Sequence, residues 1–163
     1  YARPEAAAKW VARELEATGE PVEIDSTMAD LLPTLASLPD GLRARARYVL
    51  ENEDPCRVSI IRGGEEEPQS GEVRTMQVSG RTLSGKLAAA MRARLLGESG
   101  EPPCGRLELR LAGRSAAKEA AIAVKILQRF LPPPAQERLH FHVRAEHFEG
   151  YRKQGLVVSV AAS

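Results

Sequence analysis

Hydrophobic and polar positions in the second part of the chain follow two periods in turn. Residues 72–79 predict a first strand, and Leu107, Leu109 and Leu111 alternate with charged residues in a second. Residues 82–96, which lie between them, carry apolar side chains at intervals of three and four, the period of an amphipathic helix. This segment therefore begins as β-α-β.

A second helix and two more strands complete the pattern. Ser115 is a predicted N-cap for an alanine-rich helix that reaches Leu131, where three prolines end it. Residues 139–145 and 156–160 predict a third and a fourth strand, so the order is β-α-β-α-β-β. Since β-α-β crossovers are right-handed, we expect an α/β sandwich with both helices on one face of a four-stranded sheet. The predicted open-face residues are Glu108, Arg110, His140, His142 and Arg144.

The first part of the chain predicts a shorter α-β-α-β order. The expected elements are a helix at 4–18, a strand at 22–25, a helix at 28–38 that breaks at Pro33, a helical piece at 41–52 and a strand at 57–61. This is the middle of the order predicted for the second part.

Two stretches also indicate an internal repeat. Residues 12–21 and 93–102 share Ala, Arg, Gly, Glu and Pro at a constant offset of 81, and the strands that begin at 57 and 139 lie 82 apart. Sequences rich in Ala, Arg and Glu produce such matches by chance. Either residues 1–64 are a degenerate copy that starts just after a missing first strand, or they are an unrelated acidic α/β segment.

Residues 65–71 predict a linker between domains at 1–64 and 72–163, because they combine acidic residues with Pro and Gly. The formal net charge is only +1, but it is unevenly distributed. Residues 1–71 carry eight Lys and Arg against fourteen Asp and Glu, and residues 72–163 carry fifteen against eight. A basic half predicts an anionic partner, whereas the acidic half weakens long-range attraction to a polyanion.

The composition is that of a globular chain, with 43% hydrophobic and 28% charged residues. No apolar run reaches the length of a membrane span and no signal peptide is present, so we expect an intracellular, soluble protein of the cytoplasm, the nucleus or an organelle, without a membrane partner. A first residue Tyr1 in place of Met suggests a processed protein or a fragment. Cys56 and Cys104 are isolated and predict free thiols.

The sequence lacks the common catalytic and cofactor motifs. It contains no nucleophile elbow, no phosphate loop and no zinc-protease motif. His140, His142 and His147 resemble a metal-binding run, but the first two need a third ligand within reach and are more typical of exposed strand positions. We therefore expect no enzyme activity, no cofactor, no metal and no small-molecule substrate.

Three segments resemble the bacterial stage V sporulation protein S family and, more distantly, the Alba superfamily. The resemblance covers residues 72–163. The matching pieces are Val78-Ser79-Gly80-Arg81, the helix from Ser84 to Leu95, and the run from Leu109 to Ala120 that leads to Ala123-Val124-Lys125. The last is the most specific, because a small residue and a glycine end a strand before an Ala- and Val-rich helix.

The resemblance implies an Alba-like fold, dimer formation, and binding of DNA or RNA without catalysis. Alba-type proteins use basic residues after the first strand and a basic hairpin between the last two. The corresponding residues here are Arg81 and Lys86, then Tyr151, Arg152 and Lys153. Arg114 and Lys118 join them because a helix amino-terminus favours phosphate. The loop carries one basic residue where Alba proteins typically carry a lysine pair.

Two functions follow as hypotheses. The first is a nucleic-acid-binding module with low sequence specificity, and the alternative is an architectural subunit that holds protein partners in a ribonucleoprotein or cytoskeletal assembly. Protein contacts or self-association are expected in addition, because the second helix is apolar on more than one side. Its alanines would meet the corresponding helix of the first half or the same helix of another copy; they are Ala116, Ala117, Ala120, Ala121 and Ala123.

Overall fold

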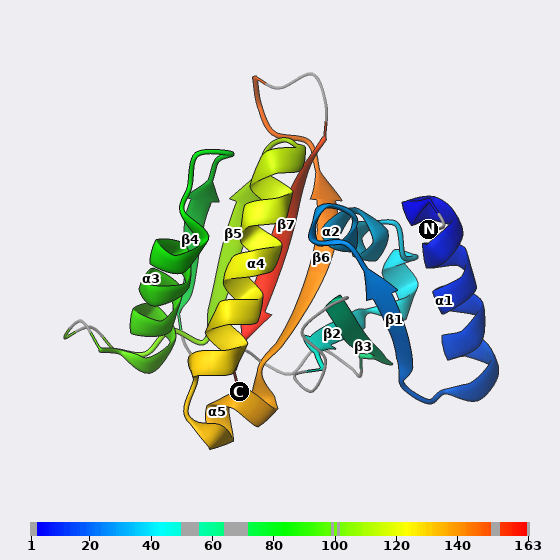
Figure 1. The fold of residues 1–163 in the computed structure, drawn as a ribbon, viewed down its shortest axis with the longest axis horizontal. Coiled ribbons are helices and arrows are strands. Elements are labelled where there is room, and N and C mark those ends of the chain that lie inside the picture. The colour runs from blue at the N-terminus through cyan, green and yellow to red at the C-terminus, as the bar shows by residue number, and fades with distance from the viewer. Residues whose placement is uncertain are drawn as a thin grey trace.

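The protein is a mixed α/β structure with all its strands in one sheet (Figure 1). The computed structural model describes residues 3–49, 56–63, 72–98, 100, 102–150 and 154–162. The helices are α1 (Pro4–Thr18), α2 (Met28–Ala36), a 3-10 turn (Asp40–Leu42), α3 (Ser84–Leu96), α4 (Arg114–Phe130) and α5 (Pro133–Arg138). The strands are β1 (Val22–Ser26), β2 (Ala44–Tyr48), β3 (Cys56–Arg62), β4 (Val73–Val78), β5 (Arg106–Leu111), β6 (His140–Glu146) and β7 (Gly155–Ala161).

The sheet order is β1-β3-β2-β6-β7-β5-β4 among the described residues. β4 and β5 are parallel, and the other neighbouring pairs are antiparallel. The mixed α/β class and the β-α-β-α-β-β order of the second half agree with the sequence prediction. The expected four-stranded sheet needs correction, because β2 continues it at β6 and adds the strands of the first half.

One strand of the first half was predicted wrongly. Residues 41–52 were expected to be helical, but β2 pairs with β3 on one side and with β6 on the other. Arg and Ala are good helix formers, so local propensity favoured a helix. The period-two alternation of Ala44, Ala46 and Tyr48 with Arg45 and Arg47 fits the strand, and tertiary pairing decides the outcome.

Smaller differences occur at helix ends. Gly113, not Ser115, is the residue before α4, and no side chain caps this helix. The prolines end α4 as predicted, but they also begin the short helix α5, because proline is tolerated in a first helical turn. The predicted linker at 65–71 lies outside the described residues, whereas Gly63 before it and Glu72 after it are described.

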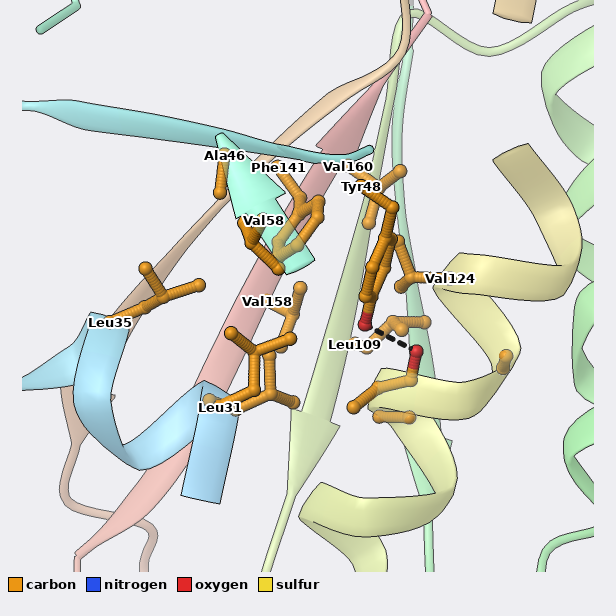
Figure 2. Packing of buried hydrophobic residues seen from close by; sticks show 14 of the residues in the cluster. Leu31, Leu35, Ala46, Tyr48, Val58, Leu109, Val124, Phe141, Val158 and Val160 are labelled. Atoms are coloured by element: carbon orange, nitrogen blue, oxygen red, sulfur yellow. Dashed lines mark hydrogen bonds between the residues drawn. The ribbon is translucent and has the colours of Figure 1, made fainter. Parts of the chain in front are cut away.

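The two halves also meet through their helices. α2 packs against α4, and its Leu31 and Leu35 lie in one buried cluster with residues of β2, β3, β6 and β7 (Figure 2). Of the two partners expected for the alanine face of α4, the structure shows the helix of the first half. The sheet, the helix pair and the core are therefore shared between the halves.

The halves have corresponding arrangements about the β2–β6 junction. From the edge to the centre, β1-β3-β2 matches β5-β7-β6 in chain order and in pairing direction. β3 then corresponds to β7, whereas the 82-residue offset had matched it with β6. An internal repeat of the sequence stays a prediction.

Candidate nucleic-acid interface

The loop after β4 and the start of α4 lie against each other, as the predicted site requires. A Cβ on Gly80 would lie 2.9 Å from Cβ of Ser115, so the close approach depends on glycine. Ser79 orders the loop, because its backbone N–H donates to Thr82 Oγ1 at 2.9 Å and its hydroxyl oxygen accepts from Arg81 N–H at 3.2 Å. Arg81 is exposed in this turn, next to the first turn of α4.

The other predicted cations of this end differ in their surroundings. Arg114 Nη2 lies 3.1 Å from Asp30 Oδ1, so this guanidinium links α4 to α2. Lys86 is exposed in the first turn of α3, and Lys118 is exposed at the fifth residue of α4. Arg114 is therefore a contact between the halves, and the two lysines remain available to solvent.

The predicted hairpin residues Tyr151, Arg152 and Lys153 lie outside the described residues. Their flanks are described, since Glu146 of β6 pairs with Gly155 of β7. This end of β6 and β7 lies at the same end of the sheet as the start of α4 (Figure 1). The chain thus brings the predicted loop, the start of α4 and the base of the hairpin to one end.

A second group of cations gathers on the sheet face opposite the helices. The predicted residues Glu108, Arg110, His140, His142 and Arg144 alternate with the core residues Leu107, Leu109, Leu111, Phe141 and Val143, so they lie on the sheet face away from the helices. Burial, and then the cations around it, lower the pKa of the His142 imidazole. These cations are Arg106, Arg144, His140 and Arg45. We call His142 and these four side chains the central basic surface.

Arg45 of the central basic surface comes from the acidic half of the chain. It lies on β2, whose Ala46 is opposite Phe141 of β6. The helical interpretation of 41–52 concealed it, and the alternation of Arg with Ala was the signal that could have found it. Its neighbour Arg47 is already used, since its guanidinium donates to the carbonyl oxygens of Glu137 at 2.9 Å and Gln136 at 3.3 Å in α5.

Carboxylates neutralise part of this face. Arg144 Nη2 lies 3.5 Å from Glu108 Oε2 and 3.6 Å from Glu146 Oε2. Both pairs are partly exposed, and such pairs are weak. On β7, Ser159 lies opposite Glu108 and is only 2% exposed. Its hydroxyl has no hydrogen-bond partner among the described residues. The face therefore combines cations with a buried hydroxyl that lacks a partner in the described chain.

His142 gives the central basic surface a predicted pH dependence. Its pKa lies below the ordinary value in the folded chain, so the unfolded chain binds more protons below about pH 6.5 and stability falls as the pH is lowered. A bound polyanion should raise this pKa, so it should bind more tightly at lower pH. An NMR titration of the imidazole with and without an oligonucleotide measures the shift of its pKa. In His142→Gln, the affinity for the oligonucleotide should no longer differ between high and low pH.

The predicted histidine run and the two cysteines lie on separate segments of the described chain. There, no group of three or more His, Cys, Asp or Glu side chains is placed to hold a metal ion. His140 Nδ1 lies 3.0 Å from the carbonyl oxygen of Arg138. Cys56 and Cys104 are buried free thiols, and burial raises the pKa of Cys56 to about 11, so it stays protonated at neutral pH.

No described helix is long and apolar enough to cross a membrane. No protein-family model matches the sequence, and no curated protein matches it.

Proposed function

We propose that this protein binds DNA or RNA without catalysis and with low sequence specificity. One observation carries the proposal: arginines and histidines from both halves converge around His142 on the open face of the sheet. Phosphate contacts by such cations supply affinity that does not depend on base sequence. The first half has a net negative charge, but it still contributes Arg45 to the central basic surface.

A second group of predicted cations, which we call the end cluster, consists of Arg81, Lys118, Arg152 and Lys153. We include it in the proposal as an extension of the central basic surface. Arg81 and Lys118 are exposed near the start of α4, and the β6–β7 hairpin leaves the sheet at the same end (Figure 1). Arg144 lies on β6 toward that hairpin, so one strand of nucleic acid could contact both groups. The arrangement of β4, β5, β6 and β7 with α3 and α4 supports an Alba-like architecture for the second half, which we include in the proposal.

Few aromatic side chains are available for base stacking, so phosphate contacts are the main source of affinity that the chain offers. Phe148 is the one aromatic ring that we find beside the open face among the described residues. Its face is already covered by Arg110, whose Cζ lies 4.5 Å from the ring centroid. Stacking platforms give single-strand binders much of their affinity. We therefore expect phosphate contacts to dominate and affinity to fall steeply with salt.

The test removes charge from the central basic surface. In Arg45→Gln combined with Arg106→Gln, affinity for a labelled oligonucleotide should fall, and the slope of log affinity against log salt should decrease by about 0.9 for each phosphate of duplex DNA that is no longer neutralised. Fluorescence anisotropy over a salt series measures both. The matched control, Lys9→Gln combined with Arg13→Gln, removes the same charge from exposed positions of α1 and should leave the slope unchanged.

A second variant tests the end cluster. Replacing Arg81, Arg152 and Lys153 together by Gln should weaken binding and flatten its salt dependence in the same way. If the wild type shows no salt-dependent binding to RNA or DNA, the nucleic-acid function is wrong. A protein-binding architectural role would then be the remaining hypothesis, and copurifying protein rather than nucleic acid would support it.

A further inference from the structure

A groove of about 500 Å³ lies between α1, β1 and α2, whose Asp30 and Thr34 line it. α1 lines it with Ala6, Ala7 and Trp10, and β1 lines it from Glu23 to Ser26. Trp10 keeps 47% of its surface exposed, although it is large and mostly apolar. β1 is also the last strand on that side of the sheet among the described residues. The groove therefore joins an exposed aromatic side chain to a strand edge that is open in the described chain.

The second half of the sheet shows what fits such a place. β5 pairs with β7 as β1 pairs with β3, and α3 precedes β5 as α1 precedes β1. Outside β5 lies β4, which pairs with it in parallel. Met76 and Val78 of β4 pack against the core. At the corresponding place beside β1, the described chain has the groove.

The burial of matching core residues differs accordingly. Leu109 of β5 is opposite Val158, and Ile24 of β1 is opposite Val58, so the two hold corresponding positions. Leu109, which lies beside Met76, is completely buried, whereas Ile24 is only half-buried. A side chain placed beside Ile24 as Met76 is placed beside Leu109 would complete the burial of this apolar surface.

The groove is acidic as well as apolar. Its charged residues are Glu23, Asp25 and Asp30, and no Lys or Arg is among the described residues that line it. Asp25 is held by Arg57 at 2.8 Å, and Asp30 by Arg114 at 3.1 Å. Glu23 is exposed and forms no ion pair with a described residue, although the charge of Arg57 acts on it. A basic side chain would therefore find its counter-charge at Glu23.

We propose that this groove is a docking site for an extended segment of a partner protein, which adds to β1 as a parallel strand. The segment places an apolar side chain beside Ile24, facing Trp10, and a basic side chain near Glu23. Backbone hydrogen bonds to the edge of β1 supply affinity, and the alternating side chains supply specificity. Docking uses β1 with α1 and α2, whereas nucleic-acid binding is proposed for the open face and the start of α4. The Asp30–Arg114 ion pair lies where the two regions meet.

The first test uses a capped peptide with the sequence of residues 73–79, which carries the β4 side chains including Arg74 and Met76. Trp10 is the only tryptophan of the chain, so its fluorescence reports directly on the groove. We expect a saturable blue shift of Trp10 emission and NMR amide shifts confined to β1 and α1. The same peptide with Met76→Pro should bind at least about tenfold more weakly, because it lacks a strand N–H and the apolar side chain.

Chain variants locate the site. Ala6→Phe fills the groove from an exposed position and should reduce peptide affinity at least about tenfold, the factor that corresponds to 1.4 kcal/mol. Ala17→Phe, also exposed on α1 but outside the groove, is the matched control and should bind like the wild type. Glu23→Lys should weaken the peptide at low salt and lose most of that effect at high salt.

A tethered strand keeps the test decisive if the free peptide is too weak. Residues 73–83, which contain β4 and its loop, are fused ahead of α1, in the order that β4 and α3 have in the second half. Tethering raises the effective concentration to the millimolar range. The fusion should raise the melting temperature and shift Trp10 emission relative to its Met76→Pro version. If free and tethered strands both behave like their proline versions, or if binding survives Ala6→Phe, the groove does not take a strand.

Discussion

Replacing Ala121 by Glu is expected to unfold much of the protein. Ala121 is 0% exposed on α4, and its carbonyl oxygen accepts a hydrogen bond of 2.6 Å from the Tyr48 hydroxyl of the first half (Figure 2). A carboxylate there has no room in the packed contact between the helices, and burying a charge is among the costliest changes known. We expect a loss of about 4 kcal/mol or more, which is a large part of the stability of an ordinary domain.

Urea unfolding followed by circular dichroism measures this loss, with chromatographic size as a second readout. Lys118→Glu is the control, because it introduces the same side chain at an exposed position of the same helix and should change stability little. Pairing of the halves within one chain predicts a monomeric wild type and a variant that is less stable. A wild-type dimer that Ala121→Glu converts into an equally stable monomer would contradict this interpretation of α4.

The second half was predictable from sequence because its periods are strong and local. Leu107, Leu109 and Leu111 alternate with charges, and the alanine stripe of α4 repeats at helical spacing, so each element has one consistent solution. β2 was not predictable in this way, since an Arg- and Ala-rich stretch satisfies both a helix and a strand. Only its pairing with β3 and β6 decides between them, and that pairing is a long-range contact.

The candidate site also combines residues that local sequence patterns indicate with residues that only long-range pairing brings in. Turns and helix starts in the sequence are enough to name Arg81, Arg114 and Lys118 as candidates, and their binding of nucleic acid stays a prediction. Arg45 could not be named in this way, because its place beside His142 depends on a junction between the halves that no local pattern encodes. The same junction explains why a strand-sized groove beside Trp10 was not expected from the sequence. Its shape depends on which strand is outermost, and sheet order is a property of the whole fold.

The second large effect is expected at Gln128, whose side chain hydrogen-bonds to the backbone of β2 as a neighbouring strand would. Gln128 is 0% exposed on α4; its Oε1 accepts from Tyr48 N–H at 2.9 Å, and its Nε2 donates to the Tyr48 carbonyl oxygen at 2.7 Å. Gln128→Leu keeps the volume but leaves two buried backbone groups without these partners, at about 1–3 kcal/mol each. We expect a net loss of about 2–4 kcal/mol in urea unfolding.

Two controls separate the effect of hydrogen bonds from that of packing. Tyr48→Phe removes only the hydroxyl that donates to Ala121, and it should cost about 1 kcal/mol because no buried donor is left behind. Gln136→Leu removes a partly exposed amide that donates to the Arg129 carbonyl oxygen at 3.1 Å, and it should cost less than about 1 kcal/mol. The order Gln128→Leu, Tyr48→Phe, Gln136→Leu therefore follows from how many buried polar groups each change leaves unsatisfied. Equal losses in the first and last variants would show that the backbone of Tyr48 finds other partners, and that α4 does not fix β2 through this amide.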